Sequence, residues 1–331
     1  MIIDRLNIWH YNKKMNTIGA DPEFILVDLN DTPKSAIEII KKNKYEKIQI
    51  EGLNFFYDNV LAECSIKPAK NKIEFIKNIK KSISIFCNLV KPYKITTKSA
   101  AHYSNFDLLH KEANKVGCAY EDCAYSLETI DPKEIENFFK KNNLRTAGGH
   151  IHLGTFLGKE DISCIMLVRT LDLFLGFTFL LLEKSEGQFE RRKIYGSPGR
   201  YRQPTYGVEY RTISNFWLSS PLLVELAYDI SKFCINFTKQ KQYEKFWKID
   251  FDKLNSDEFW NNGGDPTSCH QCVAYDINFF KSLFKMKHSE VKNKGHEIEK
   301  LVEKHLPKEI FNKIKNLENK KFDLYKEWSI F

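Results

Sequence analysis

The sequence predicts an α+β fold, from three observations. Residues 147–154, AGGHIHLG, have the period-two pattern of a β-strand, in which two histidines alternate with two apolar residues. Residues 71–89 place isoleucine and phenylalanine on one side of an amphipathic helix and lysine on the other. From about residue 240 the chain becomes lysine-rich and helical in pattern. We therefore expect a main domain at 1–240 and a helical C-terminal extension packed on it at 241–331.

The composition indicates a protein with a sizeable hydrophobic core that binds anionic partners. Of the 331 residues 42% are hydrophobic and 14% aromatic, and the net charge is +8. A positive charge favours nucleotides, phosphates, acidic substrates or nucleic acid. The lysines alternate with glutamates, which is typical of solvated helix faces more than of a nucleic-acid-binding stripe.

The sequence also predicts a cytoplasmic protein without a membrane segment. The first residues, MIIDR, lack the form of a signal peptide, and the apolar run at 173–182 is too short to span a bilayer. Eight cysteines without a secretory signal are expected to be reduced thiols.

The first predicted strand, 17–29, places Asp21 and Glu23 on one face. Two neighbouring carboxylates repel each other unless a cation or a basic group lies between them, although a solvent-facing acidic pair is an equal alternative. Pro22 cannot donate a ladder hydrogen bond, so we expect this strand to lie at an edge or to begin here.

Two further strands are expected at 46–52 and 55–67. Glu63 lies inside the second, and burial of a carboxylate in an apolar strand is costly without a partner. Asp58 could act with Glu63 or form a turn. Another strand is predicted at 94–103.

Residues 115–125 have the composition of a loop. Its two cysteines, Cys118 and Cys123, could bind a metal, but a substrate-lining loop or a plain connector is favoured. The strand with the two histidines follows at 144–156, where the glycines allow a ligand or a neighbouring strand to approach. Residues 161–184 then predict a buried helix.

A basic, glycine-containing segment spans 186–203. Arginine presents a planar fork that binds two phosphate oxygens at once. Tyr195 and Tyr201 could stack on a base, so single-stranded nucleic acid remains an alternative. The basic side chains of the segment are Arg191, Arg192, Lys193, Arg200 and Arg202.

The next strand, 204–217, places Glu209 and Arg211 on the face opposite Val208. A helix capped by serine follows at 222–238. Cys269 and Cys272 form a single CxxC pair, which is half of a zinc site, and no second pair lies at the usual spacing.

Unusual polar residues thus come from four predicted strands, and antiparallel strands of one sheet could bring them to one face. Clustered carboxylates favour Mg²⁺ or Mn²⁺, and the arginine segment would add phosphate-binding groups. These are the components of phosphoryl transfer from a nucleotide. There is no P-loop and no GxGxxG before a helix. The residues concerned are Asp21, Glu23, Glu63, His150, His152, Glu209 and Arg211.

At this point the motifs resemble a known family, the phage-type carboxylate–amine ligases (amidoligases), which is similar to glutamate–cysteine ligase and glutamine synthetase. The resemblance runs over residues 17–220. The first strand of the related ligases carries Glu-x-Glu, whereas this chain has Asp21-Pro22-Glu23, a change at one expected metal position. The motifs, in order, are GADPEF (19–24), NVLAE (59–63), VGC (116–118), AGGHIHLG (147–154), RRKIYG (191–196) and YGVEYRTISNFW (206–217).

The resemblance implies a curved antiparallel sheet of the glutamine synthetase-like type, with helices on its outer face and ATP in its concave face. A small-molecule or peptide carboxylate would be phosphorylated, and an amine would then displace phosphate to form an amide. The implied ligands of two or more Mg²⁺ ions (or Mn²⁺) are Asp21, Glu23, Glu63, His150 or His152, and Glu209. The implied contacts to phosphate or substrate carboxylate are Arg191, Arg200 and Arg211, and those to ATP are Arg192, Lys193, Arg202 and Tyr206.

Two other functions remain open from the sequence. The first is a metal-dependent hydrolase or phosphotransferase that uses His150 and His152 on Zn²⁺ or Mn²⁺. The second is a non-catalytic nucleic-acid-binding protein on the same scaffold. The identity of the acid and the amine, and the oligomeric state, do not follow from the residues.

Overall fold

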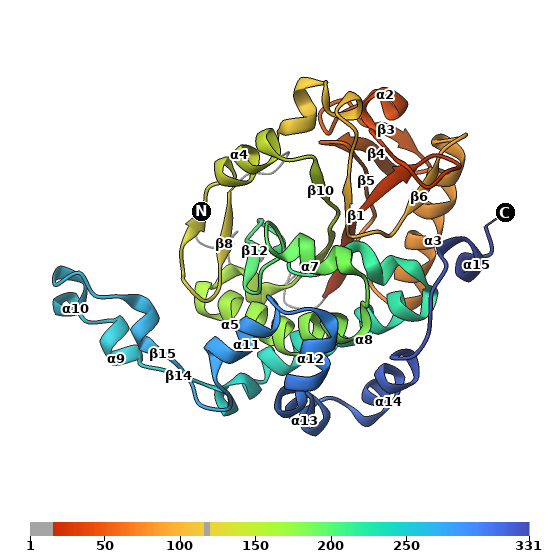
Figure 1. Cartoon of the computed structure of the whole chain (residues 1–331). Helices are drawn as coiled ribbons and strands as arrows, with labels where there is room; N and C mark the ends of the chain where they lie inside the picture. The colour runs from red at the N-terminus through yellow and green to blue at the C-terminus, as the bar shows by residue number, and fades with distance from the viewer. Residues whose placement is uncertain (1–15, 116–119, 331) are drawn as a thin grey trace, which may run out of the picture.

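The computed structural model describes residues 16–115 and 120–330 of the chain (Figure 1). Within these residues the main element is an eleven-stranded antiparallel sheet that is not closed. Two short strands, β2 (Pro33–Lys34) and β6 (Lys94–Thr96), pair with the end of β1. The other nine follow one another in the order β3 (Ile48–Ile50), β4 (Leu53–Asp58), β5 (Leu61–Ser65), β1 (Thr17–Val27), β11 (Gly149–Gly154), β13 (Gly207–Tyr210), β12 (Arg200–Arg202), β8 (Glu121–Cys123) and β9 (Thr129–Ile130).

β1 is a central strand, so the expectation that Pro22 marks an edge or a strand start was wrong. Residues Thr17 to Pro22 pair with β11 on one side. The recorded pairing with β5 on the other side is Glu23 with Glu63 and Phe24 with Ala62. Pro22 therefore lies just before the residues that pair with β5. Its lack of an N–H group does not prevent β1 from pairing with both neighbouring strands.

Three predicted strands are in fact pairs of strands, and one of them, residues 144–156, divides into β10 (Leu144–Thr146) and β11. Residues 55–67 divide into β4 and β5 because Asn59 has a φ of +56°, and its side-chain oxygen accepts a hydrogen bond from the Val60 amide at 2.8 Å. Asparagine tolerates this left-handed conformation, which reverses the chain. Residues 94–103 divide into β6 and β7 (Ala100–His102), and β7 pairs with β10 (Leu144–Thr146) in a separate small sheet.

The predicted helices are present. The first is α3 (Lys72–Leu89), capped by Asn71, whose side chain accepts from the Glu74 amide. Its buried face contains Phe75, whereas Ile73, expected in that stripe, is exposed. The second is a continuous helix of α5 (Asp161–Leu171), the π-turn η4 (Asp172–Gly176) and α6 (Phe177–Leu182), and the third is α8 (Pro221–Lys239).

These helices cover the apolar face of the sheet. Phe24 of β1, Ile151 of β11 and Tyr210 of β13 belong to one core cluster with residues of α3, α5 and α8. In Figure 1, α5 and α8 lie side by side beneath the strands. Residues Asp161–Leu182 are long and apolar enough to cross a membrane by length and composition, but the window is completely buried inside the protein, as expected of a core helix.

The C-terminal region is not purely helical as predicted. Its first part is a hairpin of β14 (Trp247–Ile249) and β15 (His270–Cys272), which encloses α9 (Phe251–Leu254) and α10 (Asp257–Asn261). The later helices contribute Phe280, Leu283 and Trp328 to the same core as the sheet. They are α11 (Ile277–Leu283), α12 (His288–Lys294), α13 (His296–His305), α14 (Lys308–Leu317) and α15 (Leu324–Trp328).

The remaining helical elements are short connections between strands. They are α2 (Ile37–Ile40), η1 (Phe106–Leu108), η2 (Lys111–Asn114), α4 (Lys133–Lys141), η3 (Phe156–Lys159), α7 (Glu186–Arg192), η5 (Asn215–Ser219), η6 (Gln242–Lys245) and η7 (Pro266–Cys269).

Candidate active site

The polar side chains of the central strands line one cavity of about 200 Å³. Neighbouring strands β5, β1, β11, β13 and β12 supply most of the lining, so the four strands expected to share a face do so. The lining residues that the sequence singled out are Asp21, Glu23, Asp58, Glu63, His150, Arg202, Glu209 and Arg211, and those it did not are Lys44, Lys47, Phe56 and Ser65.

Strand register explains this convergence. Asp21 lies directly opposite His150 across the β1–β11 ladder. Glu23 lies opposite Glu63 in β5, and Glu209 in β13 lies opposite His152. Directly opposed residues of an antiparallel pair have Cβ atoms about 5 Å apart. A single face therefore brings four carboxylates to the lining of one cavity.

Arg211 connects the carboxylates on one side of the cavity. Its guanidinium is almost completely buried, with Nε 3.1 Å from Glu121 Oε2 and Nη1 bonded to the Glu209 carboxylate. Nη1 also lies 3.3 Å from His150 Nδ1. Burial raises the pKa of Glu209, and the cations His152 and Arg202 oppose this rise.

His150 is buried and neutral. Burial, together with the positive charges of Arg211 and Arg191, holds its pKa well below the ordinary value. Its Nε2 is buried and has no hydrogen-bond partner among the described residues. A ligand atom is therefore the natural partner for this nitrogen.

His152 has a different environment, between Asp21 and Tyr206. Its Nε2 lies 3.0 Å from Asp21 Oδ2, and its Nδ1 contacts the Tyr206 hydroxyl. Although burial opposes it, the Asp21 carboxylate raises the pKa of His152, and His152 in turn lowers the pKa of Asp21 against the effect of burial. The two histidines of the motif thus differ in charge state and in partners.

Glu23 is held in place by the backbone of the glycine motif. Its Oε2 accepts a hydrogen bond from the Gly148 amide at 2.5 Å, and its own amide donates to the Gly148 carbonyl at 3.2 Å. Burial raises its pKa to about 7, an effect that this hydrogen bond reduces and the charge of Asp58 increases. A cation bound nearby would favour the ionised form.

The motif glycines are required by packing within the chain. A Cβ at Gly148 would lie 2.5 Å from His150 Nε2, and a Cβ at Gly149 would lie 2.3 Å from Trp217 Nε1. That indole donates to the Gly149 carbonyl at 3.0 Å. The sequence allowed either a ligand or a neighbouring strand to approach these glycines. At both positions it is a neighbouring group of the protein that comes close.

The basic segment divides into two groups. Arg200 and Arg202 belong to β12, where a loop was expected, with Nη1 atoms 3.4 Å from Glu121 Oε1 and 3.5 Å from Glu209 Oε1, respectively. Buried atoms without a hydrogen-bond partner among the described residues include Arg200 Nη1 and Arg191 Nε. Arg202 lines the cavity and Arg200 lies beside it in the same ion-pair network.

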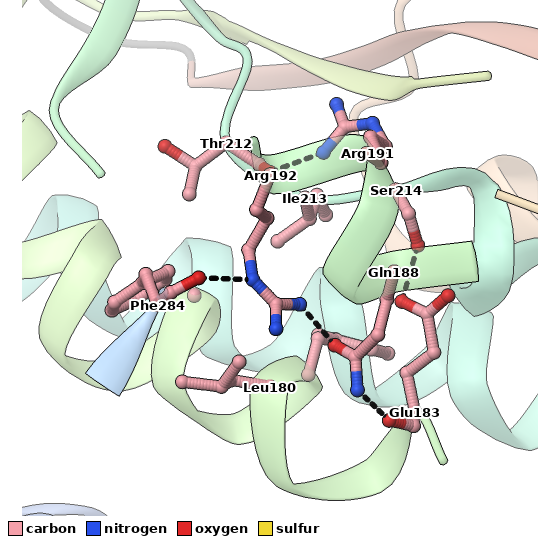
Figure 2. A pocket seen from close by; sticks show the side chains of 11 residues that line it. Leu180, Glu183, Gln188, Arg191, Arg192, Thr212, Ile213, Ser214 and Phe284 are labelled. Atoms are coloured by element: carbon pink, nitrogen blue, oxygen red, sulfur yellow. Dashed lines mark hydrogen bonds between the residues drawn. The ribbon is translucent and has the colours of Figure 1, made fainter. Parts of the chain in front are cut away.

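The structure does not bring Arg192 and Lys193 to the cavity, contrary to their expected role at ATP. At the end of α7, Arg192 donates to the Phe284 carbonyl and to Gln188 (Figure 2), and also to the Met286 carbonyl. Lys193 pairs with Glu190 on the surface at 2.7 Å. The helical turn of α7 aims both side chains away from the sheet.

Arg191 is also turned toward the chain itself. Its Nη1 donates to the Thr212 carbonyl at 2.7 Å, and it borders a small second pocket with Glu183 and Gln188 (Figure 2). Burial lowers its pKa to about 10. Together with a hydrogen bond from its Nη2 to the Arg211 carbonyl, the contact with the Thr212 carbonyl holds the backbone that directly follows β13.

Sequence reasoning missed Glu121, Lys44 and Lys47. Glu121 is buried and pairs with both Arg200 and Arg211, but it lies in residues 115–125, which were expected to be a loop. The two lysines belong to a run of surface-like lysines. No local pattern distinguishes Glu121, because pairing of β8 within the sheet gives it its position.

A smaller cavity of about 50 Å³ adjoins the first. Glu23 and Asp58 line both cavities, so Asp58 is more than a turn residue. The remaining lining is largely apolar and includes Leu61, Phe139 and Tyr195. This arrangement offers an apolar recess next to two carboxylates.

In residues 16–115 and 120–330 no group of three or more His, Cys, Asp or Glu side chains is already arranged to hold an ion. Cys269 is buried and Cys272 is half-buried, so the CxxC pair gains no further ligand there. Cys118 lies outside the described residues.

Residues 141–256 match the family described as phage phiEco32-like COOH.NH2 ligase-type 2. This is the family that the motifs resemble. The match contains β11, β12 and β13, and thus His150, Arg202, Glu209 and Arg211 of the cavity wall. The family name indicates a carboxylate–amine ligase. No curated protein matches the chain.

Proposed function

We propose that this protein is an ATP-dependent carboxylate–amine ligase that works through an acyl phosphate. The observation that carries the proposal is that the family-matched strands form one wall of a cavity whose other wall is the carboxylates of β1 and β5. The open antiparallel sheet with helices on one face also supports a glutamine synthetase-like fold.

The carboxylates fit the divalent cations that such a reaction requires. Asp21, Glu23, Glu63 and Glu209 surround the cavity, and carboxylate oxygen is the ligand that Mg²⁺ and Mn²⁺ prefer. Bound there, Mg²⁺ would neutralise phosphate charge and orient the γ-phosphate.

We expect these carboxylates, more than the histidines, to hold the metal. His150 Nδ1 accepts from Arg211, which leaves the proton on Nε2, and His152 is engaged by both of its nitrogens. In this tautomer His150 Nε2 is a hydrogen-bond donor for an anionic oxygen.

The buried donors fit an anion at the same place. His150 Nε2 and Arg200 Nη1 lack hydrogen-bond acceptors among the described residues, and a buried donor without an acceptor costs about 1–3 kcal/mol. A phosphate or a substrate carboxylate would satisfy both. Arg202 and Arg211 would add charge without reorganising, because Glu209 already fixes them.

The site would bring together ATP, a substrate carboxylate and an amine. A free carboxylate is a poor electrophile, so transfer of the γ-phosphoryl group of ATP to it supplies a leaving group. The amine then attacks the acyl carbon, and phosphate departs. We place the amine in the smaller cavity, where Glu23 and Asp58 lie next to apolar side chains.

The test is a search for condensed products. The purified chain is incubated with ATP, Mg²⁺ and mixtures of amino acids and peptides, and mass spectrometry looks for products that have lost water while phosphate release is recorded. Glu209→Gln should abolish both signals, and the surface variant Glu190→Gln should keep them.

Three results would count against the proposal. Absence of Mg²⁺-dependent ATP binding would remove its basis. One tightly held zinc ion per chain would favour the metal-dependent hydrolase. A salt-sensitive nucleic-acid complex that is unchanged in Glu209→Gln would favour the binding protein.

A further inference from the structure

The hairpin of β14 and β15 forms an arm that projects from the body of the protein. Its end, residues 248–268, is called the arm tip here and contains α9 and α10. Figure 1 shows this segment extending away from the sheet and from the later C-terminal helices. No residue of the arm lines the cavity of the candidate active site.

The base of the arm is fixed. Trp247 is buried, and the Arg169 guanidinium lies 4.3 Å from the centre of its ring. Arg169 Nη1 also lies 3.1 Å from His270 Nδ1, and the Asp250 amide donates to the Cys269 carbonyl at 2.9 Å. Both strands of the hairpin are therefore attached to α5, and this attachment directs the tip outward.

The tip has no core of its own. None of its 21 residues is buried, whereas Trp247 and Cys269 on either side are. Phe251 and Trp260 are 50% and 49% exposed. Ordering each residue costs about 1–2 kcal/mol of backbone entropy, which apolar burial normally offsets. The apolar burial that would offset this cost must therefore come from contact of the tip with another surface.

The tip also differs in charge from the rest of the molecule. It has two lysines against four aspartates and one glutamate, a net charge of −3, so the remainder of the +8 chain carries +11. No carboxylate of the tip forms an ion pair within 4 Å with another described residue. An acidic surface with exposed aromatic side chains therefore faces solvent next to a strongly basic body.

We propose that the arm tip docks on the basic surface of a second copy of this chain. The charges are complementary, and the fixed base keeps the tip away from its own body. With 21 residues the tip approaches the roughly 20–30 residues that each side of a stable interface contributes. Exchange of arms about a two-fold axis would bury both tips at once.

The sign of the charge argues against other occupants. Nucleic acid and anionic lipid would be repelled by five carboxylates with two lysines. A different basic protein would have the required charge, and the experiment separates it from a second copy.

Sedimentation of the full-length protein is the first measurement. At low salt we expect twice the mass of one chain, with dissociation as salt rises because charge pairs are screened. Phe251→Ser with Trp260→Ser should sediment as a single chain with an unchanged melting temperature, since neither side chain touches the core. A control, Leu29→Ser, removes an apolar side chain that is 80% exposed outside the arm and should keep the doubled mass.

Cross-linking identifies the occupant. A carbodiimide joins carboxylates to lysines in a mixture of ¹⁴N- and ¹⁵N-labelled protein, and peptides containing Asp252, Asp257 or Glu258 should be linked to lysines of the other label. The proposal would be overturned if the natural protein sedimented as a single chain, or if the control Leu29→Ser also lost the doubled mass. It would likewise be overturned if the cross-links of the tip joined only peptides with the same label. A single-mass chain that binds a polylysine peptide through its tip would assign the arm to another basic partner and would also overturn it.

Discussion

Nη1 of Arg211 lies 3.3 Å from Nδ1 of His150, in the centre of the polar face of the sheet. A guanidinium can only donate, so Nδ1 accepts and the imidazole remains neutral with its proton on Nε2. The same arginine binds Glu209 and Glu121. One side chain thus sets the protonation of the motif histidine and the orientation of two carboxylates.

Replacement of Arg211 by lysine should therefore reduce activity although the positive charge at this position is kept. Arg211→Lys keeps one positive charge but cannot bond to His150, Glu209 and Glu121 together, because the ammonium is compact. We expect kcat for phosphate release to fall by about 100-fold or more. Arg169→Lys, at another buried arginine outside the cavity, should leave kcat unchanged. A fully active Arg211→Lys would contradict the role given to this residue.

Glu23 should make stability depend on pH. Its pKa rises from 4.5 in the unfolded chain to about 7 in the folded one. Because the folded state holds the proton more tightly, stability decreases as pH rises between these two values. Glu23→Gln should therefore be more stable than the natural chain above about pH 8, on the order of 2 kcal/mol, and no more stable near pH 4.

Thermal unfolding at the two pH values measures this difference, and Mg²⁺ adds a second readout. A cation at the carboxylates stabilises ionised Glu23, so Mg²⁺ should reduce the advantage of the variant at high pH. An advantage that is the same at both pH values would show that Glu23 is not the titrating group.

The ion pair of His152 and Asp21 should also make stability depend on pH, and its two partners act at opposite ends of the pH range. The raised pKa of His152 contributes stability that is complete below 6.5 and is lost as pH rises through the raised value. The lowered pKa of Asp21 contributes stability above 3.8 that is lost as pH falls. His152→Gln should therefore cost more free energy of unfolding near pH 6 than near pH 9, measured by urea unfolding. An equal cost at both would contradict an ion pair.

The sequence predicted the polar face of the sheet well because period-two alternation is local. Asp21, Glu23, Glu63 and Glu209 could be assigned to one face from strand pattern alone. The division of the strand at Asn59 was not predicted, although Asp58 was considered as a turn residue, because only the positive φ of Asn59 shows where the chain reverses. Glu121 was missed for a different reason: its role comes from Arg200 and Arg211, which are far away in the chain.

The basic segment shows the same limit. Arginines close in sequence were expected at one ligand, but α7 places Arg192 against the carbonyls of Phe284 and Met286. Arg200 and Arg202 instead reach the site from β12. Charge composition predicted a binding segment, whereas the division between helix and strand decided which arginines face the cavity.

The motif glycines allow a matched pair of substitutions. Gly149→Ala would place a Cβ 2.3 Å from Trp217 Nε1 and 2.7 Å from the Ser214 carbonyl, so we expect a loss of about 2–4 kcal/mol. Gly19→Ala in the neighbouring β1 meets nothing closer than 3.6 Å and should be nearly neutral. Chemical denaturation of both variants tests the packing explanation, and equal stabilities would refute it.

Asp172 is a buried carboxylate beneath the site, at the π-turn between α5 and α6. It accepts hydrogen bonds from the Gly199 amide at 2.5 Å, the Tyr210 hydroxyl at 2.6 Å and the Thr212 hydroxyl at 3.1 Å. These donors flank the residues of β12 and β13 that face the cavity. Asp172 therefore fixes the two strands from their apolar side.

Asp172→Asn should weaken this support more than removal of one donor does. An asparagine amide turns an N–H₂ group toward one of the three donors, so a buried donor loses its acceptor, at a cost of about 2–4 kcal/mol. Burial raises the pKa of Asp172 to about 7, so above this pH the hydrogen bond from Tyr210 is to a charged group, and Tyr210→Phe should cost about 1–2 kcal/mol there. In the double variant the total loss of stability should be smaller than the sum of the two single losses, because both substitutions disturb the same hydrogen-bond network. Full additivity in urea unfolding would show that Asp172 and Tyr210 stabilise the strands independently.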